Sequence, residues 1–166
     1  MTEHTLNENN LIDLKGVVKQ YQSMAGNVVA LKGIDLQVQA GEFFVVTGKS
    51  GAGKTTLINM ITGLDGCTEG NIYVNSVPVH ELSPAKAAAW RGQHVGVVFQ
   101  TFELLPTLTI LHNVMLPMDF AGKYSRRERK QRALLLLDQV EIAGHAGKLP
   151  SEVSGGQQQR VAIARA

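Results

Sequence analysis

The chain has 166 residues, 44% of them hydrophobic and 18% charged, a composition that excludes a disordered protein and favours one globular domain. The formal net charge of +2 is too small to hold a protein on nucleic acid by itself, although it suits an anionic ligand. Cys67 is the only cysteine, which excludes an intrachain disulfide and a multi-cysteine zinc site and fits a reducing compartment.

The amino terminus begins with the polar stretch MTEHTLNENN, which has neither the positively charged start nor the apolar core of a secretory signal. We expect residues 1–10 to form a flexible tail. The longest apolar runs, FFVV at 43–46 and ALLLL at 133–137, are far shorter than the roughly 18 residues of a membrane span. Any membrane association is therefore expected to depend on a partner.

Two segments with alternating apolar residues come next, LIDLKGVVKQY at 11–21 and VVALKGIDLQVQAG at 28–41. This alternation is typical of half-buried strands, and we expect the two to pair antiparallel. FFVVT at 43–47 is a short unbroken apolar run before a glycine-rich stretch, which predicts a central parallel strand buried on both faces.

A helix is expected from Lys54 to about Thr62, followed by a strand over NIYVN at 71–75. Ser83 and Pro84 have the residue types of an N-cap and a first helical position, so the next helix is expected to begin there. HVGVVF at 94–99 has the composition of another buried strand.

Beyond Gln100 the pattern becomes helical. Helices are predicted from Thr109 to about Ala121 and from Ser125 to about Val140, the second opened by the capping-box pattern Ser-Arg-Arg-Glu. We expect residues 101–153 to form a helical subdomain inserted into an α/β core. The basic stretch KYSRRERKQR at 123–132 is either a solvated helix face or a surface for lipid headgroups or a membrane partner.

The segment at 48–55, GKSGAGKT, matches the pattern G-x-x-x-x-G-K-[ST] and is called the phosphate loop below. It lies between an apolar run and a predicted helix, which is the context that this motif requires. Its glycines let main-chain N–H groups converge on phosphate oxygens, and the helix start adds the positive end of its dipole. Lys54 is expected to reach the β- and γ-phosphates and the Thr55 hydroxyl to ligate magnesium. The alternative is a glycine-rich turn with an incidental lysine. The full set of predicted nucleotide-binding residues here is Gly48, Lys49, Ser50, Gly51, Ala52, Gly53, Lys54, Thr55 and Thr56.

Two members of this set have other interpretations. Lys49 either adds to the positive field at the phosphates or is an exposed loop lysine, and Thr56 is either a minor contact or helix surface. A second glycine pair, in VSGGQQQR at 153–160, stands where another helix is expected to begin and is again suited to phosphate. From the residues alone, this pair could serve the same nucleotide or one held by another copy.

From about residue 11 to residue 166 the chain resembles the ATP-binding cassette (ABC) family, the nucleotide-binding subunits of transporters. The motifs occur in the family's order: the aromatic Tyr21, the phosphate loop GKSGAGKTT, VVFQ ending in Gln100, and the signature SGGQQQR. VGVVFQTFELLPTLTILHNVMLP and SGGQQQRVAIARA are most similar to subunits of the macrolide-efflux and lipoprotein-release subgroup. The resemblance implies one α/β domain over 11–166, a P-loop NTPase of ABC type with an antiparallel β subdomain and the helical subdomain.

The resemblance also implies roles. Tyr21 would stack on adenine, worth about 1–3 kcal/mol by analogy with base stacking on proteins, unless it is an ordinary tyrosine at a strand end. Gln100 would approach magnesium and the attacking water, and with Lys54 it forms the expected catalytic pair, unless it is a plain loop glutamine. The signature residues would contact the γ-phosphate held by a second cassette in a head-to-tail dimer, which favours another copy: Ser154, Gly155, Gly156 and Gln157.

The chain departs from the family pattern in three ways. Val153 stands where leucine is usual and Lys49 where proline is frequent, and neither position supplies a required donor. The strand ending in Asp-Glu and the later switch histidine, which in the family follow the signature helix, are not in this sequence. We therefore expect the carboxy-terminal part of the core to be missing, the chain to be truncated after the signature, and the catalytic half-site to be incomplete and inactive alone. None of the histidines substitutes: His4, His80, His94, His112 and His145.

The favoured hypothesis is the amino-terminal part of a subunit that binds and hydrolyses ATP with Mg²⁺. It would pair with a second ATP-binding subunit and with transmembrane permease subunits, through a surface near 102–106, on the cytoplasmic face of the inner membrane. The alternative is a truncated, non-hydrolytic nucleotide-binding or regulatory fragment. A chromosome or DNA-repair ATPase is disfavoured because no coiled coil or zinc module separates the two phosphate motifs, so no nucleic acid partner is expected. A GTPase or small-molecule kinase would not carry the SGGQ element.

Overall fold

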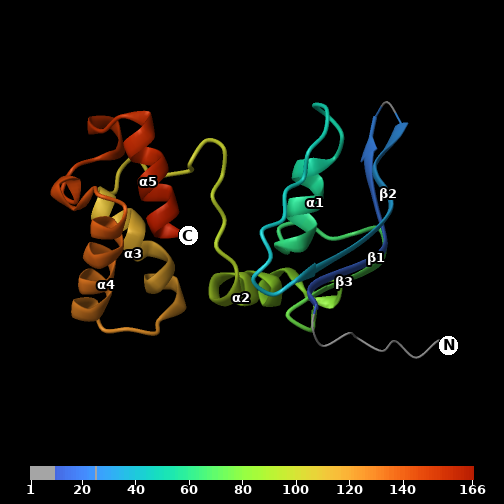
Figure 1. Ribbon diagram of the computed structural model, residues 1–166, viewed down its shortest axis with the longest axis horizontal. Helices are drawn as coiled ribbons and strands as arrows, with labels where there is room; N and C mark the ends of the chain where they lie inside the picture. Colours follow the sequence, from blue (N-terminus) through green and yellow to red (C-terminus); the bar gives the residue numbers. More distant parts are fainter. Residues whose placement is uncertain (1–9, 25) are drawn as a thin grey trace. The chain divides into compact units, whose positions relative to one another are not determined.

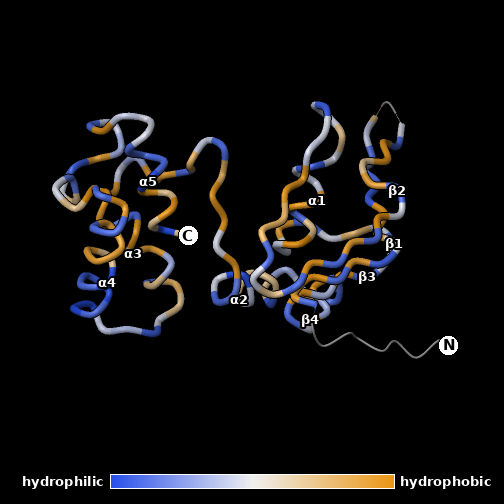
Figure 2. Tube along the Cα trace, in the orientation of Figure 1, coloured by the Kyte–Doolittle hydropathy of each residue, from blue (hydrophilic) through white to orange (hydrophobic). Residues whose placement is uncertain are grey.

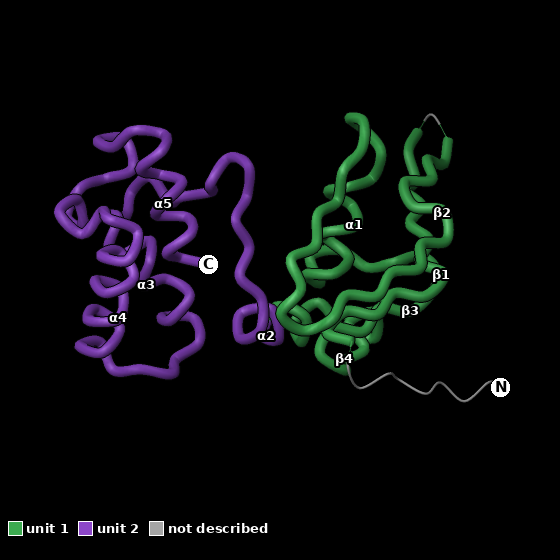
Figure 3. Tube along the Cα trace, in the orientation of Figure 1, with its two compact units in different colours: residues 1–88 green, residues 89–166 purple. Residues whose placement is uncertain are grey.

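A computed structural model describes residues 10–24 and 26–166 of the chain. The chain divides into two compact units, unit 1 (Met1–Ala88) and unit 2 (Ala89–Ala166), which Figure 3 distinguishes by colour. The predicted tail at 1–10 lies outside the described residues, except for Asn10, where the first strand begins.

Unit 1 is built on a four-stranded antiparallel sheet (Figure 1). Its order is β2-β1-β3-β4, so the first two strands of the chain are neighbours and β3 pairs with the other side of β1. The predicted antiparallel pair and the predicted strand over 71–75 are confirmed. The strands are β1 (Asn10–Ser23), β2 (Gly26–Gln39), β3 (Glu69–Val74) and β4 (Val77–Pro78).

The sheet buries one face because apolar side chains occupy alternate positions. Leu14 of β1 pairs with Leu36 of β2 on one side and with Ile72 of β3 on the other. Helix α1 (Lys54–Ile61) contacts β2 and β3, and its buried residues are Leu57 and Met60. The orange bands along the strands in Figure 2 follow this alternation. The predicted helix from Lys54 is confirmed. Burial of its apolar side chains holds it against β2 and β3.

A short 3-10 turn, η1 (Val79–Glu81), leads from β4 to helix α2 (Pro84–His94), which crosses from unit 1 into unit 2. The predicted start of this helix is confirmed. The Lys86 N–H donates a hydrogen bond to the Ser83 hydroxyl at 3.4 Å, as an N-cap would accept it.

Two segments predicted as buried strands do not form strands. The run at 43–47 is irregular, and Phe43 is 92% exposed. In the run at 94–99, His94 ends α2 and the remaining residues are irregular. A strand exists only where another strand satisfies its N–H and C=O groups, and no described strand in either unit pairs with these segments. The prediction was wrong because an apolar run indicates burial and not the partner that completes a sheet.

Unit 2 is helical over the stretch for which helices were predicted. Its helices are α3 (Ile110–Ala121), α4 (Arg126–Gln139) and α5 (Gly155–Arg165), with 3-10 turns η2 (Ala143–His145) and η3 (Pro150–Glu152) between the last two. The three helices contact one another pairwise around a shared apolar core. Its buried members are Ile110, Val114, Met115, Ala133, Leu137, Ile142, Val161 and Ala164.

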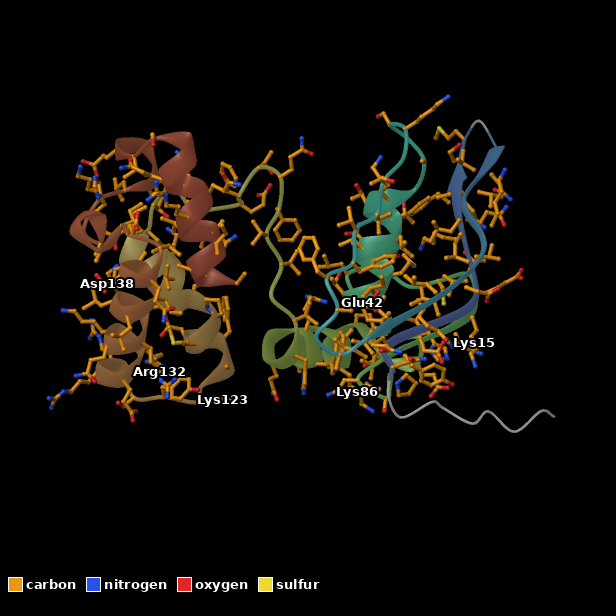
Figure 4. The ribbon with its side chains drawn as sticks, in the orientation of Figure 1. Lys15, Glu42, Lys86, Lys123, Arg132 and Asp138 are labelled. Atoms are coloured by element: carbon orange, nitrogen blue, oxygen red, sulfur yellow. The ribbon has the colours of Figure 1, made fainter. Side chains whose placement is uncertain are left out.

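The predicted capping box at the start of α4 is confirmed. The Glu128 N–H donates to the Ser125 hydroxyl at 3.3 Å, and the Ser125 N–H donates to the Glu128 carboxylate at 2.8 Å. Arg132 and Asp138, both labelled in Figure 4, are exposed charged residues of α4. Within the described ranges, none of the helices has both the length and the apolar character required to traverse a bilayer.

Candidate functional site

The phosphate loop leads directly into α1. Gly53 is the N-cap of this helix and adopts a left-handed conformation with φ of 86°. No side chain caps the helix, and its first turn contains no acidic residue. The first N–H groups of α1 therefore lack both an intrahelical partner and a carboxylate, and they add to the positive end of the helix dipole. This arrangement is suited to an anion.

Gly53 also packs tightly against β2. A Cβ atom at this position would lie 2.6 Å from the carbonyl oxygen of Ala30 and 3.0 Å from the Leu31 side chain. Only glycine fits both the left-handed backbone and this approach. The start of α1 is thus held against the sheet by the main chain itself.

Lys54 is folded back over the loop. Its ammonium donates hydrogen bonds to the carbonyl oxygens of Gly48 and Lys49, both at 2.8 Å. An ammonium has three donors, so one remains for a ligand. The loop therefore combines a fixed positive charge with the unpaired N–H groups of the helix start, which is the chemistry that a phosphate requires.

The rest of the predicted loop set is open to solvent or nearly so. Lys49, Ser50, Gly51, Ala52 and Thr55 are exposed, and Thr56 is half-buried. The Thr55 hydroxyl makes no hydrogen bond to any residue that the structure describes, so this oxygen is available to a hard cation such as magnesium. No group of three or more His, Cys, Asp or Glu side chains that could hold a metal ion exists among residues 10–24 and 26–166.

Tyr21 lies on β1, in the same unit as the phosphate loop, and 39% of it is exposed. Its hydroxyl donates a hydrogen bond of 2.9 Å to Asp65. The ammonium of Lys19 donates to the other oxygen of Asp65 at 2.7 Å and lies 4.8 Å from the centre of the Tyr21 ring. Asp65 and Lys19 were not predicted as site residues, because a contact between residues 44 positions apart, such as Tyr21 and Asp65, leaves no local pattern in the sequence.

Asp65 is ionised in this setting. Partial burial raises the pKa of Asp65, but hydrogen bonds from Lys19, Tyr21 and the Gly66 N–H, together with the charge of Lys19, outweigh that effect. The pKa of Asp65 consequently lies below its ordinary value of 3.8. Near neutral pH, Lys19 and Asp65 form an ion pair beside the Tyr21 ring.

The four predicted signature residues lie together at the start of α5. Ser154 is the N-cap, and it exchanges hydrogen bonds with Gln157: the Gln157 N–H donates to the Ser154 hydroxyl at 3.4 Å, and the Ser154 N–H donates to the Gln157 side chain at 2.8 Å. Gly155 and Gly156 are exposed between them. The main-chain N–H groups of the two glycines are thereby left for an anion at a helix N-terminus.

Gln100 is exposed and lies at a turn in unit 2, the unit that contains the signature residues. The phosphate loop and Tyr21 belong to unit 1. The predicted site residues therefore form two groups, one in each unit.

The loop that follows Gln100 is fastened to two helices by residues that sequence analysis missed. Asn113 of α3 is fully buried; its side chain accepts from the Leu105 N–H at 2.8 Å and donates to the carbonyls of Leu105 and Leu108 at 3.1 and 3.0 Å. Arg165 of α5 donates to the carbonyl of Phe102 at 2.6 Å. A buried asparagine whose hydrogen bonds all go to main-chain groups can be recognised in a sequence only as a polar residue on an otherwise apolar helix face.

Known proteins are similar to this chain in sequence. The profile of the ABC transporter family matches residues 31–166. The macrolide export ATP-binding/permease protein MacB of Rhodopirellula baltica is 45% identical over 157 residues, which are 94% of this chain and 23% of that protein. The lipoprotein-releasing system ATP-binding protein LolD of Francisella tularensis is 38% identical over 156 residues, 94% of this chain and 68% of that protein.

A solved structure shares the fold. The dimeric structure of a post-hydrolysis state of the ATP-binding cassette MJ0796, bound to ADP and Pi, matches with a TM-score of 0.87 at 42% sequence identity, over 93% of this chain and 68% of that one. The α/β cassette fold expected from the resemblance is thus confirmed. MJ0796 itself, an uncharacterized ABC transporter ATP-binding protein of Methanocaldococcus jannaschii, is 43% identical over 159 residues, and this chain spans 68% of its length. On the profile match and this identity, the chain belongs to the ABC transporter family.

Proposed function

We propose that this chain supplies the nucleotide-binding part of an ABC transporter subunit that binds and hydrolyses MgATP. The observation that supports it best is the start of α1, where the Lys54 ammonium lies over the phosphate loop beside an uncapped helix N-terminus. A chain of phosphates is the anion that uses both features at once, because it spreads charge over several oxygens.

N–H groups of the phosphate loop and Lys54 hold the β- and γ-phosphates, and Tyr21 stacks on the base. The Thr55 hydroxyl would be the protein oxygen that holds magnesium, and the ion would supply neutralisation of phosphate charge. Lys54 and Gln100 are the proposed catalytic residues, Gln100 as an uncharged amide that both donates and accepts hydrogen bonds near the attacking water.

The signature residues are proposed to act on a second copy. The exposed N–H groups of Gly155 and Gly156 at the start of α5 suit the γ-phosphate of a nucleotide held by a partner, and the related MJ0796 cassette is described as a dimer. Hydrogen bonds to a charged group contribute about 1.5–3 kcal/mol each, so two or three contacts per site approach the roughly 5.5 kcal/mol that inverts a 1:99 equilibrium. Loss of the γ-phosphate would then reopen the dimer.

The family membership supports the proposed partners and place in the cell. Hydrolysis is proposed for the full-length subunit, working as a head-to-tail pair on transmembrane permease subunits at the cytoplasmic face of the membrane. The contact surface for the permease is proposed near Phe102–Pro106, the loop that Asn113 and Arg165 fasten to α3 and α5.

The decisive experiment is a fluorescent-nucleotide titration with magnesium. Lys54→Ala should lose measurable binding while the far-UV circular dichroism spectrum stays that of the parent. Lys86→Ala is the matched control, since Lys86 is an exposed lysine of the same unit, on α2 (Figure 4). Unchanged affinity of the Lys54 variant would overturn the assignment of the phosphate site.

A further inference from the structure

We propose that Asp65 and Lys19 are positioning residues that hold the Tyr21 ring as a platform for the nucleotide base. This inference rests on the proposed function, in which Tyr21 stacks on the base. Nothing in the sequence around Asp65 and Lys19 predicts such a role for these two side chains.

The contacts on Tyr21 restrict its ring at two points. The hydroxyl is tied to Asp65 at 2.9 Å, and the Lys19 ammonium lies over one face at 4.8 Å from the ring centre. Tyrosine has two side-chain torsions, so anchoring the far end of the ring and occupying one face leaves little rotational freedom. We place the base on the face that Lys19 does not cover.

Asp65 is itself held rigidly, so it can act as an anchor. The Lys19 ammonium donates both to an Asp65 oxygen and to the carbonyl of Gly66, each at 2.7 Å, and the Gly66 N–H donates to the same carboxylate at 2.8 Å. The adjoining loop is tied to β1 by the Thr68 N–H, which donates to the carbonyl of Val18 at 2.8 Å. Asp65 and Tyr21 are therefore both held by strand β1.

The same loop connects the platform to the phosphate loop. Helix α1 begins with Lys54, and Asp65 lies four residues beyond its last residue, Ile61. The N–H groups of Leu64 and Asp65 both donate to the carbonyl of Asn59, at 2.9 and 3.2 Å. These hydrogen bonds hold the loop to the end of the helix. An eight-residue helix spans about 12 Å and is stiff on that scale. Asp65 thus fixes the distance between the base platform and the phosphate site.

The charges of the pair also suit a nucleotide. An unpaired carboxylate beside the base would repel a polyanion, but Lys19 neutralises Asp65 at 2.7 Å. The remaining side of the Lys19 ammonium faces the ring, where its field acts through the π system. Both residues hold the platform without adding net charge to the site.

The test compares two ligands, ATP and inorganic tripolyphosphate, by isothermal titration calorimetry with magnesium present. Tripolyphosphate has no base, so it reports the phosphate loop alone. Tyr21→Ala should weaken ATP about 5- to 150-fold, the range that base stacking gives, and leave tripolyphosphate within about twofold. Asp65→Asn, which keeps the shape of the side chain, should weaken ATP several-fold with the same selectivity. Lys19→Arg, which keeps the cation, should restore most of the affinity lost in Lys19→Gln.

Two further variants complete the design. Tyr21→Phe removes the hydroxyl and keeps the ring, so it tests the same anchor if Asp65→Asn does not fold. Asp138→Asn is the control, because Asp138 is an exposed aspartate of α4.

The outcomes are distinct. A selective loss in Tyr21→Ala without any selective loss in Asp65→Asn or Tyr21→Phe overturns this inference and leaves the proposed function intact. Equal loss of both ligands in Asp65→Asn also overturns it, since that result marks a general structural effect. If Tyr21→Ala itself shows no selectivity for ATP, the base-stacking role in the proposed function is wrong.

Discussion

Arg165 donates a hydrogen bond of 2.6 Å to the main-chain carbonyl of Phe102, and its second terminal nitrogen donates to the carbonyl of Glu103 at 2.5 Å. Both acceptors belong to residues with positive φ, 60° and 47°, a conformation that costs free energy for non-glycine residues. Because Arg165 lies in the helix that begins with the signature residues, one guanidinium joins that helix to the loop after Gln100.

Arg165→Ala should lower the free energy of unfolding of unit 2 by about 1.5–3 kcal/mol, the contribution of hydrogen bonds to a charged group. Urea denaturation followed by circular dichroism measures this loss. Arg160→Ala is the matched control from the same helix, since the polar contacts of Arg160 with the described residues are longer, 3.4 Å to Val140 and 3.5 Å to Glu141. Equal effects of the two variants would contradict the anchoring role of Arg165.

Two glycines of the phosphate loop should respond differently to alanine. Gly51 has φ of 79° with open space around it, so Gly51→Ala should cost about 1–2 kcal/mol through backbone strain alone. Gly53→Ala should cost clearly more, because the new Cβ would also meet the Ala30 carbonyl at 2.6 Å. Urea denaturation of the two variants side by side gives the difference, and a smaller loss for Gly53→Ala would refute the packing argument.

The capping boxes of α4 and α5 provide a matched pair. Ser154→Ala and Ser125→Ala should each destabilise by about 0.5–2 kcal/mol, since each removes the acceptor for a helix N–H. Only Ser154→Ala should also weaken nucleotide-dependent dimerisation, measured by sedimentation velocity with a slowly hydrolysed ATP analogue. A dimerisation defect of the same size in Ser125→Ala would show that helix stability, and not the signature, is the cause.

Asp65 should make unit 1 sensitive to acid. The pKa of the Asp65 carboxyl is lower in the folded state than its ordinary value of 3.8. The ionised carboxylate therefore stabilises the fold at pH values above 3.8, and this contribution is lost as the pH falls through the pKa of the folded state. Thermal melts between about pH 5 and pH 2 should show a smaller fall in midpoint for Asp65→Asn than for the parent chain. Asp138→Asn should fall like the parent. Identical profiles for all three proteins would mean that Asp65 carries no stabilising contact.

Local chemistry explains what could be predicted. The antiparallel pair β1 and β2 follows from alternation along each strand, and the start of α4 follows from a serine and a glutamate three residues apart. The phosphate loop needed only eight consecutive residues. The capping box and the phosphate loop depend on residues that are neighbours in sequence, and β1 and β2 follow one another directly in the chain, so short patterns were enough to predict them.

The segments at 43–47 and 94–99 show where this reasoning fails. Their apolar composition is real, but a strand depends on a partner elsewhere in the chain, and no described strand pairs with them. The Tyr21 anchor was missed for the same reason, since Asp65 is remote in sequence and lies in an ordinary turn.

By itself the sequence determined the family, the phosphate loop, the signature helix start and most helix and strand positions, because these reside in short runs of residue types. Only the tertiary structure decided which groups hold the site in place: Asp65 on Tyr21, the Ala30 carbonyl beneath Gly53, and Arg165 on the loop after Gln100. Such contacts join distant positions through distance and hydrogen-bond geometry, which no periodicity or motif encodes.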